Sequence, residues 1–276
     1  MAGILYVVGT PIGNLSDFSP RALETLEKCD FIAAEDTRVT LKLLNKFALK
    51  KPMVSYYEHN RRERGEMILA RLLGGENCAL VTDAGMPAIS DPGEDLVALC
   101  HAHGVKVESV PGPTAFATAV AVSGLPSGRF TFEGFLSVNK PSRRQHLEEV
   151  KSEKRTMVFY EAPHKLAATL GDMLAAFGDR EIALVKELTK VHETVERTTL
   201  SAAAKKYSEI PPKGEFVLVI SGAPEEKPTE YTLESAVDFA RAQVAAGLST
   251  NEAAKAAAKQ YGFKKSDIYK ALTESV

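Results

Sequence analysis

The chain has 276 residues, of which 45% are hydrophobic and 25% are charged, and its formal net charge at pH 7 is −2. This composition is typical of a soluble globular protein and excludes a disordered chain or a fibrous repeat. The length predicts two α/β lobes with a small appendage, and the near-neutral charge means that any nucleic-acid binding must come from local basic clusters.

The first part of the chain repeats one unit, in which a short apolar strand leads into a polar loop and then a helix. Strands are predicted at residues 4–8, 31–34, 53–57, 78–81 and 105–110. Their continuous apolar runs are typical of strands that are buried on both faces. The small apolar residues 115–122 predict a further helix that Thr114 can cap. Residues 1–124 are therefore predicted to form one α/β lobe, with a hinge at 124–128.

The loop at residues 82–93 follows the apolar strand 78–81 and contains two glycines, two prolines and two aspartates. These residues fix the backbone and leave few bulky groups above the strand end. In an open parallel α/β sheet, ligands bind just beyond the carboxyl ends of the strands. The sequence predicts a ligand site at this loop, with an ordinary turn into the next helix as the alternative.

Other strand ends also deliver polar groups to the same edge of the predicted sheet. The loop at residues 9–15 has the glycine spacing GxxxG rather than GxGxxG, and the chain contains no GK[ST] phosphate loop. These features argue against nicotinamide and nucleoside-triphosphate ligands. The charged residues 35–38 follow the second strand, and Glu58-His59-Asn60 follow the third.

Residues 125–222 are predicted to form a second α/β lobe that is richer in strands, at 130–136, 156–160, 181–185, 193–200 and 213–220. Basic residues gather at 140–155 and indicate either a solvated helix face or a phosphate-binding patch. Residues 223–231 are predicted to form a linker. Residues 232–276 follow as a small helical domain that is either helix-turn-helix-like or a structural clip.

The three cysteines, Cys29, Cys78 and Cys100, form neither a CxxC pair nor a zinc-ligand cluster. We therefore expect buried free thiols in a reducing compartment and no bound metal. The N-terminal residues lack the features of a signal peptide, and no apolar run reaches the length of a membrane span. These patterns favour a cytoplasmic protein that does not contact membranes.

Six segments together closely resemble the bacterial ribosomal-RNA ribose 2′-O-methyltransferases of the tetrapyrrole methylase superfamily. They lie at residues 9–15, 34–38, 82–93, 111–115, 160–164 and 186–190, and the resemblance covers about residues 3–222. It implies a two-lobed α/β fold with mixed sheets flanked by helices, S-adenosyl-L-methionine (SAM) bound between the lobes, and a homodimer. It also implies a cytidine in the decoding region of 16S ribosomal RNA (rRNA) as the substrate, either in naked small-subunit rRNA or in the 30S subunit.

The resemblance, carried over residue by residue, gives a predicted site. The residues expected to contact SAM are Thr10, Pro11, Asp83, Ala84, Gly85, Met86, Pro87, Thr114, Ala115, Tyr160, Glu161, Ala162, Pro163, Glu187 and Leu188. A hydroxyl nucleophile needs a base, for which Lys186 and Glu187 are the leading candidates and Asp36 and His59 the alternatives. RNA phosphates are expected at Arg38, Arg61, Arg62, Arg143, Arg144 and Lys165.

The sequence thus predicts a SAM-dependent rRNA ribose methyltransferase. A tetrapyrrole C-methyltransferase and a non-catalytic RNA-binding protein remain as alternatives. Relatives that methylate porphyrinoid rings often show Gly-Asp-Pro where this chain has Gly85-Met86-Pro87. This difference and the basic clusters argue against a tetrapyrrole substrate, whereas the complete set of strand-end loops argues against a protein that only binds RNA.

Overall fold

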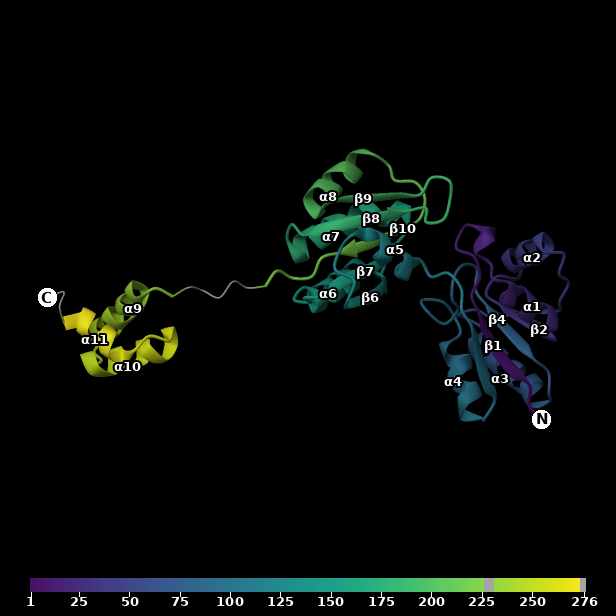
Figure 1. Ribbon diagram of the computed structural model, residues 1–276, viewed down its shortest axis with the longest axis horizontal. Coiled ribbons are helices and arrows are strands. Elements are labelled where there is room, and N and C mark those ends of the chain that lie inside the picture. Colours follow the sequence, from purple (N-terminus) through teal and green to yellow (C-terminus); the bar gives the residue numbers. More distant parts are fainter. Residues whose placement is uncertain (226–230, 274–276) are drawn as a thin grey trace. The chain divides into compact units, whose positions relative to one another are not determined.

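The computed structural model describes residues 1–225 and 231–273, which belong to two compact units, Met1–Ala223 and Pro224–Val276 (Figure 1). Residues 226–230 of the predicted linker, and the last three residues of the predicted helical domain, lie outside the described residues. In the described part of the chain, no helix is both long and apolar enough to span a bilayer. All three cysteines are buried and free, as predicted.

The first sheet of the larger unit contains five parallel strands in the order β3-β2-β4-β1-β5. The strands are β1 (Ile4–Val8), β2 (Phe31–Ala34), β3 (Met53–Ser55), β4 (Cys78–Val81) and β5 (Lys106–Val110). One face packs against α1 (Pro20–Lys28) and α2 (Thr37–Lys46), and the other against α3 (Arg61–Leu73) and α4 (Glu94–Ala102). The five predicted strands are confirmed, and their parallel arrangement brings all the carboxyl ends to one edge.

The second sheet is mixed and has the strand order β6-β7-β10-β8-β9. Its strands are β6 (Phe130–Phe135), β7 (Thr156–Glu161), β8 (Glu181–Lys186), β9 (Thr194–Thr199) and β10 (Phe216–Ile220), of which only β6 and β7 pair in parallel. Helices α6 (Lys140–Val150), α7 (Leu166–Phe177) and α8 (Leu200–Glu209) cover one face. Two 3-10 turns, η1 (Leu15–Asp17) and η2 (Pro163–Lys165), complete this unit.

Helix α5 (Ala115–Ser123) covers the other face of the second sheet, although the predicted boundary at residue 124 assigns it to the first lobe. Its buried residues Ala119 and Val120 pack against β7, β8 and β10. Their small side chains allow the helix to lie close to the sheet. The chain therefore passes from the first sheet to the second at residues 111–114, before α5 rather than after it.

The smaller unit contains, in its described part, α9 (Leu233–Ala245), α10 (Thr250–Tyr261) and α11 (Lys265–Thr273), which share an alanine-rich core. Ser249 caps α10, because its hydroxyl and the Glu252 carboxylate form a reciprocal capping box.

Candidate active site

A cavity of about 440 Å³ lies where loops from the two sheets of the larger unit meet. Its volume falls in the range typical of small-ligand sites. The lining residues come from the carboxyl ends of β1, β2 and β4, from the start of α5, and from the second sheet. They are Ile12, Glu35, Thr82, Asp83, Ala84, Gly85, Met86, Ile89, Asp91, Thr114, Ala115, Phe116, Phe135, Tyr160, Glu161, Ala162, Pro163, Leu188, Glu215 and Phe216.

The loop after β4 is held in place by the loop after β1. The backbone of Thr10 exchanges two hydrogen bonds with Gly85, at 2.9 and 3.1 Å, and its buried hydroxyl donates to the carbonyl of Thr82 at 3.2 Å. Gly85 has a φ of 94°, a conformation that favours glycine. Ala88 and Ser90 also have positive φ angles, 66° and 65°. Such strain in a loop persists only where the surroundings impose it, and it is typical of functional sites.

The cavity wall formed by the second sheet and α5 is aromatic, and a hydrogen bond and ring stacking hold it together. The hydroxyl of Tyr160 accepts a hydrogen bond from the backbone amide of Phe116 at 3.1 Å, and the ring of Phe132 stacks on that of Phe116. Tyr160 thereby satisfies an amide in the first turn of α5, where the side chain of Thr114 makes no capping bond. The predicted cap at Thr114 is therefore supplied by a side chain from a distant strand.

Glu161 is almost fully buried beside this wall, but it is not an isolated charge. Its carboxylate accepts hydrogen bonds from the hydroxyl of Thr169 and from the amide of Ala162, and Lys165 Nζ lies 3.3 Å away. Lys165 therefore neutralises a buried carboxylate at the cavity, in a position different from the exposed phosphate contact that the sequence suggested.

The opposite wall carries three carboxylates. Glu35 accepts hydrogen bonds from the hydroxyl of Thr82 and the amide of Asp83. Burial, reinforced by the charge of Glu35, raises the pKa of Asp91 to about 6, and the same two causes raise the pKa of Asp83. A cavity with this wall attracts positively charged ligands and provides a carboxylate that can exchange protons near neutral pH.

Most of the predicted SAM contacts line this cavity: Asp83, Ala84, Gly85, Met86, Thr114, Ala115, Tyr160, Glu161, Ala162, Pro163 and Leu188. Thr10 does not line the cavity but hydrogen-bonds to the loop after β4, and Pro11 lines a neighbouring hollow. Pro87 and Glu187 do not line the cavity. The residues predicted to contact SAM do not include the other residues that line the cavity, which are Ile12, Glu35, Thr82, Ile89, Asp91, Phe116, Phe135, Glu215 and Phe216. Thr82, Ile89 and Asp91 nevertheless belong to the loop 82–93, where the sequence predicts a ligand site.

Neither leading candidate for the base lies in the cavity. The Glu187 carboxylate accepts hydrogen bonds from the amide of Glu215 at 3.0 Å and from Lys190 Nζ at 3.2 Å. The backbone bond from Glu215, assisted by Lys190, lowers the pKa of Glu187, which makes it a weaker base. Lys186 ends β8 outside the lining.

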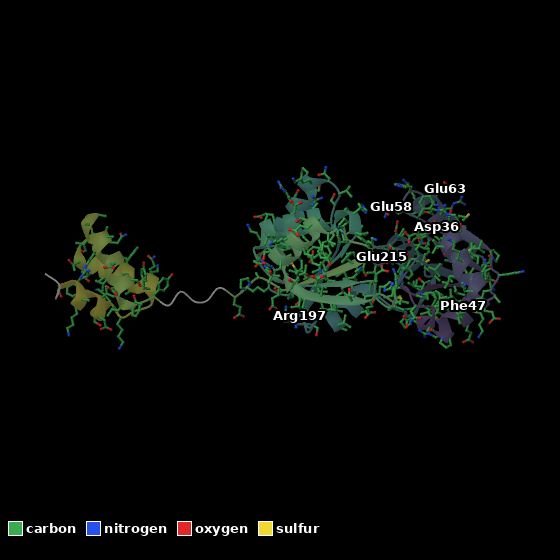
Figure 2. All side chains as sticks on the ribbon, turned by 90° about the horizontal axis from the view of Figure 1, so that it is seen from above. Asp36, Phe47, Glu58, Glu63, Arg197 and Glu215 are labelled. Atoms are coloured by element: carbon green, nitrogen blue, oxygen red, sulfur yellow. The ribbon has the colours of Figure 1, made fainter. Side chains whose placement is uncertain are left out.

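Of the two alternative bases, Asp36 has a low pKa and His59 lies at a second cavity. The guanidinium and amide of Arg38 hold the pKa of Asp36 at about 2, so Asp36 is a poor proton acceptor. His59 lines a second cavity that adjoins the first. Asp36 and Glu58 follow β2 and β3 respectively, and both are labelled in Figure 2.

Arg143 is not the exposed phosphate contact that the sequence suggested. Only 10% of its side chain is exposed, and its guanidinium donates two hydrogen bonds to Asp172, at 2.7 and 2.9 Å. It also donates to the carbonyl of Ser137 at 3.3 Å. The arginine faces inward because α6 packs against α7, where Asp172 lies. The apolar residues Leu147 and Val150 mark the buried face of α6, and Arg143, four residues before Leu147, shares that face.

Four of the six predicted phosphate contacts are exposed, and three of these, Arg38, Arg61 and Arg62, lie on the first lobe. Arg38 pairs with Asp36, Arg61 pairs with Glu58 and Asp95, and Arg144 pairs with Asp172. Arg62 is exposed and has no acidic partner within residues 1–225 and 231–273.

Two lysines that the sequence reasoning missed extend this basic surface along α2. Arg38, Lys42 and Lys46 recur every fourth residue, which places them on one side of the helix about 6 Å apart. Lys42 and Lys46 line the hollow that borders the cavity at Thr82, Asp83 and Ala84. The spacing of four residues between Arg38, Lys42 and Lys46 is visible in the sequence and could have predicted this basic row.

Among the residues that the structure describes, no group of three or more His, Cys, Asp or Glu side chains could hold a metal ion. The donors at the cavity are carboxylates already engaged with amides and hydroxyls, such as Glu35 and Glu161.

Comparisons with known proteins show the family to which the chain belongs. The family model of the Tetrapyrrole (Corrin/Porphyrin) Methylases matches residues 4–204. A Synechocystis protein named ribosomal RNA small subunit methyltransferase I is 47% identical, with 99% of this chain and 98% of that protein covered. A Thermotoga maritima protein of the same name is 49% identical and covers 80% of this chain and 99% of its own length.

Solved structures share the fold at lower identity. A uroporphyrin-III C-methyl transferase from Thermus thermophilus, complexed with S-adenyl homocysteine, gives a TM-score of 0.57 at 18% identity and covers 79% of this chain and 97% of that one. This likeness concerns the fold alone. By the family match and the near full-length relatives, the chain belongs to the tetrapyrrole methylase family and, within it, to the group of the ribosomal RNA small subunit methyltransferase I proteins.

Proposed function

We propose that the chain transfers a methyl group from SAM to the ribose 2′-hydroxyl of a cytidine in the decoding region of 16S rRNA. The observation that carries the proposal is the cavity of about 440 Å³ framed by strand-end loops, in a chain whose near full-length relatives bear the name of an rRNA small subunit methyltransferase. Methyl transfer from a sulfonium depends mainly on positioning of the reactants. Loops braced by Thr10 and Tyr160 supply that rigidity.

The residues of the cavity fit SAM. The rings of Phe116 and Tyr160 provide apolar surface for an adenine, and the carboxylates of Asp83 and Asp91 attract a cation. When bound, SAM supplies a methyl group on a positively charged sulfur. We propose that the predicted cofactor residues that line the cavity bind it, together with Ile12 and Phe116.

The basic surface of the first lobe fits RNA. Lys42 and Lys46, which follow Arg38 at four-residue spacing on α2, line the hollow that borders the cavity, and Arg61 and Arg62 begin α3. Positive side chains bind RNA through its phosphates and release counterions, so the affinity should fall as the salt concentration rises. We propose that these residues, with Arg144, position the substrate.

The test uses 30S subunits from a strain that lacks this protein. The subunits, and separately naked 16S rRNA, are incubated with the purified chain and methyl-labelled SAM, and the RNA is digested to nucleosides. The expected label is in 2′-O-methylcytidine. The matched control is Gly85→Val, which should abolish labelling because valine does not tolerate the backbone angle at this position.

Each other outcome identifies a rival function. Label on a base refutes ribose methylation and shows instead that the chain methylates an RNA base. No label on RNA, while a porphyrinoid substrate is methylated, favours the tetrapyrrole alternative. Binding of RNA without heat on titration with S-adenosylhomocysteine favours a protein that only binds RNA. We also propose a cytoplasmic homodimer, for which light scattering at micromolar concentration should give twice the mass of one chain.

A further inference from the structure

A second cavity, of about 790 Å³, adjoins the first and shares two residues with it, Glu35 and Asp91. Its other residues come from the loop after β3 and from the segment that leads into α4. The two carboxylates therefore form the boundary between the proposed SAM site and a separate, larger space that is open to solvent.

The second cavity has groups that suit a nucleotide. Tyr57 is 41% exposed and offers a ring on which a base can stack. Arg61 pairs with Glu58 and Asp95 at the cavity wall, and its guanidinium has further N–H groups that can donate to a neighbouring phosphate. The carboxylates in its lining accept hydrogen bonds, and a cytosine amino group and ribose hydroxyls can donate them.

Resting on the proposed function, we infer that the second cavity holds the target nucleotide and that Asp91 removes the proton from its ribose 2′-hydroxyl during methyl transfer. The hydroxyl oxygen forms a bond to the methyl carbon of SAM. The carbon–sulfur bond breaks, and its electron pair stays on sulfur, giving S-adenosylhomocysteine. The hydroxyl proton passes to the Asp91 carboxylate and then to water.

Asp91 suits this role better than the other shared carboxylate. Glu35 already accepts hydrogen bonds from the hydroxyl of Thr82 and the amide of Asp83, which fix its position. Burial and the charge of Glu35 raise the pKa of Asp91 to about 6, so it is ionised at neutral pH yet more basic than an ordinary aspartate. The polar and charged groups that line the second cavity or act on the Asp91 carboxylate are Glu35, Thr82, Asp83, Tyr57, Glu58, His59, Arg61, Glu94, Asp95 and Tyr160.

The first test is Asp91→Asn, measured on ribose methylation. We expect the turnover rate to fall about 10²- to 10⁴-fold, while affinities for S-adenosylhomocysteine and RNA stay within about threefold. The base must be ionised, so kcat/KM of the wild type, which reports the free protein, should fall about tenfold per pH unit below pH about 6 and be flat above it. Asp91→Glu should retain part of the rate and a pH profile of the same form.

A binding measurement gives a readout that does not depend on turnover. In the presence of S-adenosylhomocysteine, the wild type should bind target RNA about tenfold more tightly than the same RNA with a 2′-deoxycytidine at the target, because the hydroxyl donates to a charged carboxylate. Asp91→Asn, whose side-chain oxygen accepts only a neutral hydrogen bond, should discriminate between the two RNAs by about threefold or less. Asp17→Asn, the same change at an exposed residue that lines neither cavity, should behave as the wild type in every assay.

Four results overturn the inference. The first two are a wild-type turnover rate in Asp91→Asn and equal rates for Asp91→Asn and Asp91→Glu. The third is joint loss of activity and S-adenosylhomocysteine binding in both variants. The fourth is discrimination against the deoxy-RNA that stays about tenfold in Asp91→Asn. If any of these four results is obtained while the wild type still methylates ribose, the inference fails but the proposed function stands. A wild type that places no methyl group on ribose overturns the proposed function, and this inference with it.

Discussion

Replacing Arg143 by alanine should destabilise the larger unit and leave its RNA binding unchanged. The change leaves Asp172, 10% exposed, with one remaining partner, Arg144, at 3.2 Å. Breaking a buried ion pair costs about 3–5 kcal/mol, and the surviving contact to Arg144 places the expected loss near the lower limit, about 3 kcal/mol. For a unit of this size, that loss lowers the melting temperature by roughly 6–12 °C.

The matched control is Arg144→Ala. The side chain of Arg144 is 62% exposed, so its removal should cost at most about 1 kcal/mol. Urea unfolding monitored by circular dichroism measures both losses, and filter binding over a salt series measures RNA affinity. Arg144→Ala should reduce the salt slope by about one, whereas Arg143→Ala should not change it. An Arg143→Ala variant with wild-type stability and a shallower salt slope would refute the reasoning.

The pH dependence of this loss follows from Asp172. Burial alone would raise its pKa, but hydrogen bonds from Arg143 and Arg144 outweigh that effect and hold the pKa below the usual value. The carboxylate therefore contributes stability above its unfolded pKa of about 4, and this contribution is lost as the pH falls through the lower folded pKa. The stability difference between the wild type and Arg143→Ala should shrink in that acidic window, and a difference that stays constant to pH 2 would contradict the assignment.

Further changes test the cavity and the smaller unit. Tyr160→Phe should cost about 1 kcal/mol in urea unfolding, because the Phe116 amide loses its acceptor, and an unchanged midpoint would exclude the capping role. Gly85→Val should remove the heat of S-adenosylhomocysteine binding in calorimetry, since a branched residue resists a φ of 94°, and full affinity would show that the loop is not part of the site. A chain that ends before Pro224 should keep that affinity and methylate RNA more weakly, because the smaller unit has its own core, and equal loss of both would show a structural role instead.

The sequence alone determined the parallel sheet and its functional edge. Strands such as β2 and β4 are buried on both faces, and a strand of that kind must be apolar throughout, so it is visible as a short continuous run. The glycines and prolines at residues 82–93 mark a loop with restricted backbone geometry for a similar local reason. The order and spacing of six such segments predicted the family, which the comparisons confirmed.

Only the tertiary structure decided which polar side chains share a space. Arg143 and Arg144 are adjacent in sequence, yet the first is buried against Asp172 and the second is mostly exposed, because the packing of α6 on α7 selects one side of the helix. The Glu187 carboxylate accepts a hydrogen bond from the amide of Glu215, whereas Asp91 lines two adjoining cavities. Contacts between residues distant in the chain, and the burial they cause, set the charge and basicity of these groups, and a local sequence pattern contains neither.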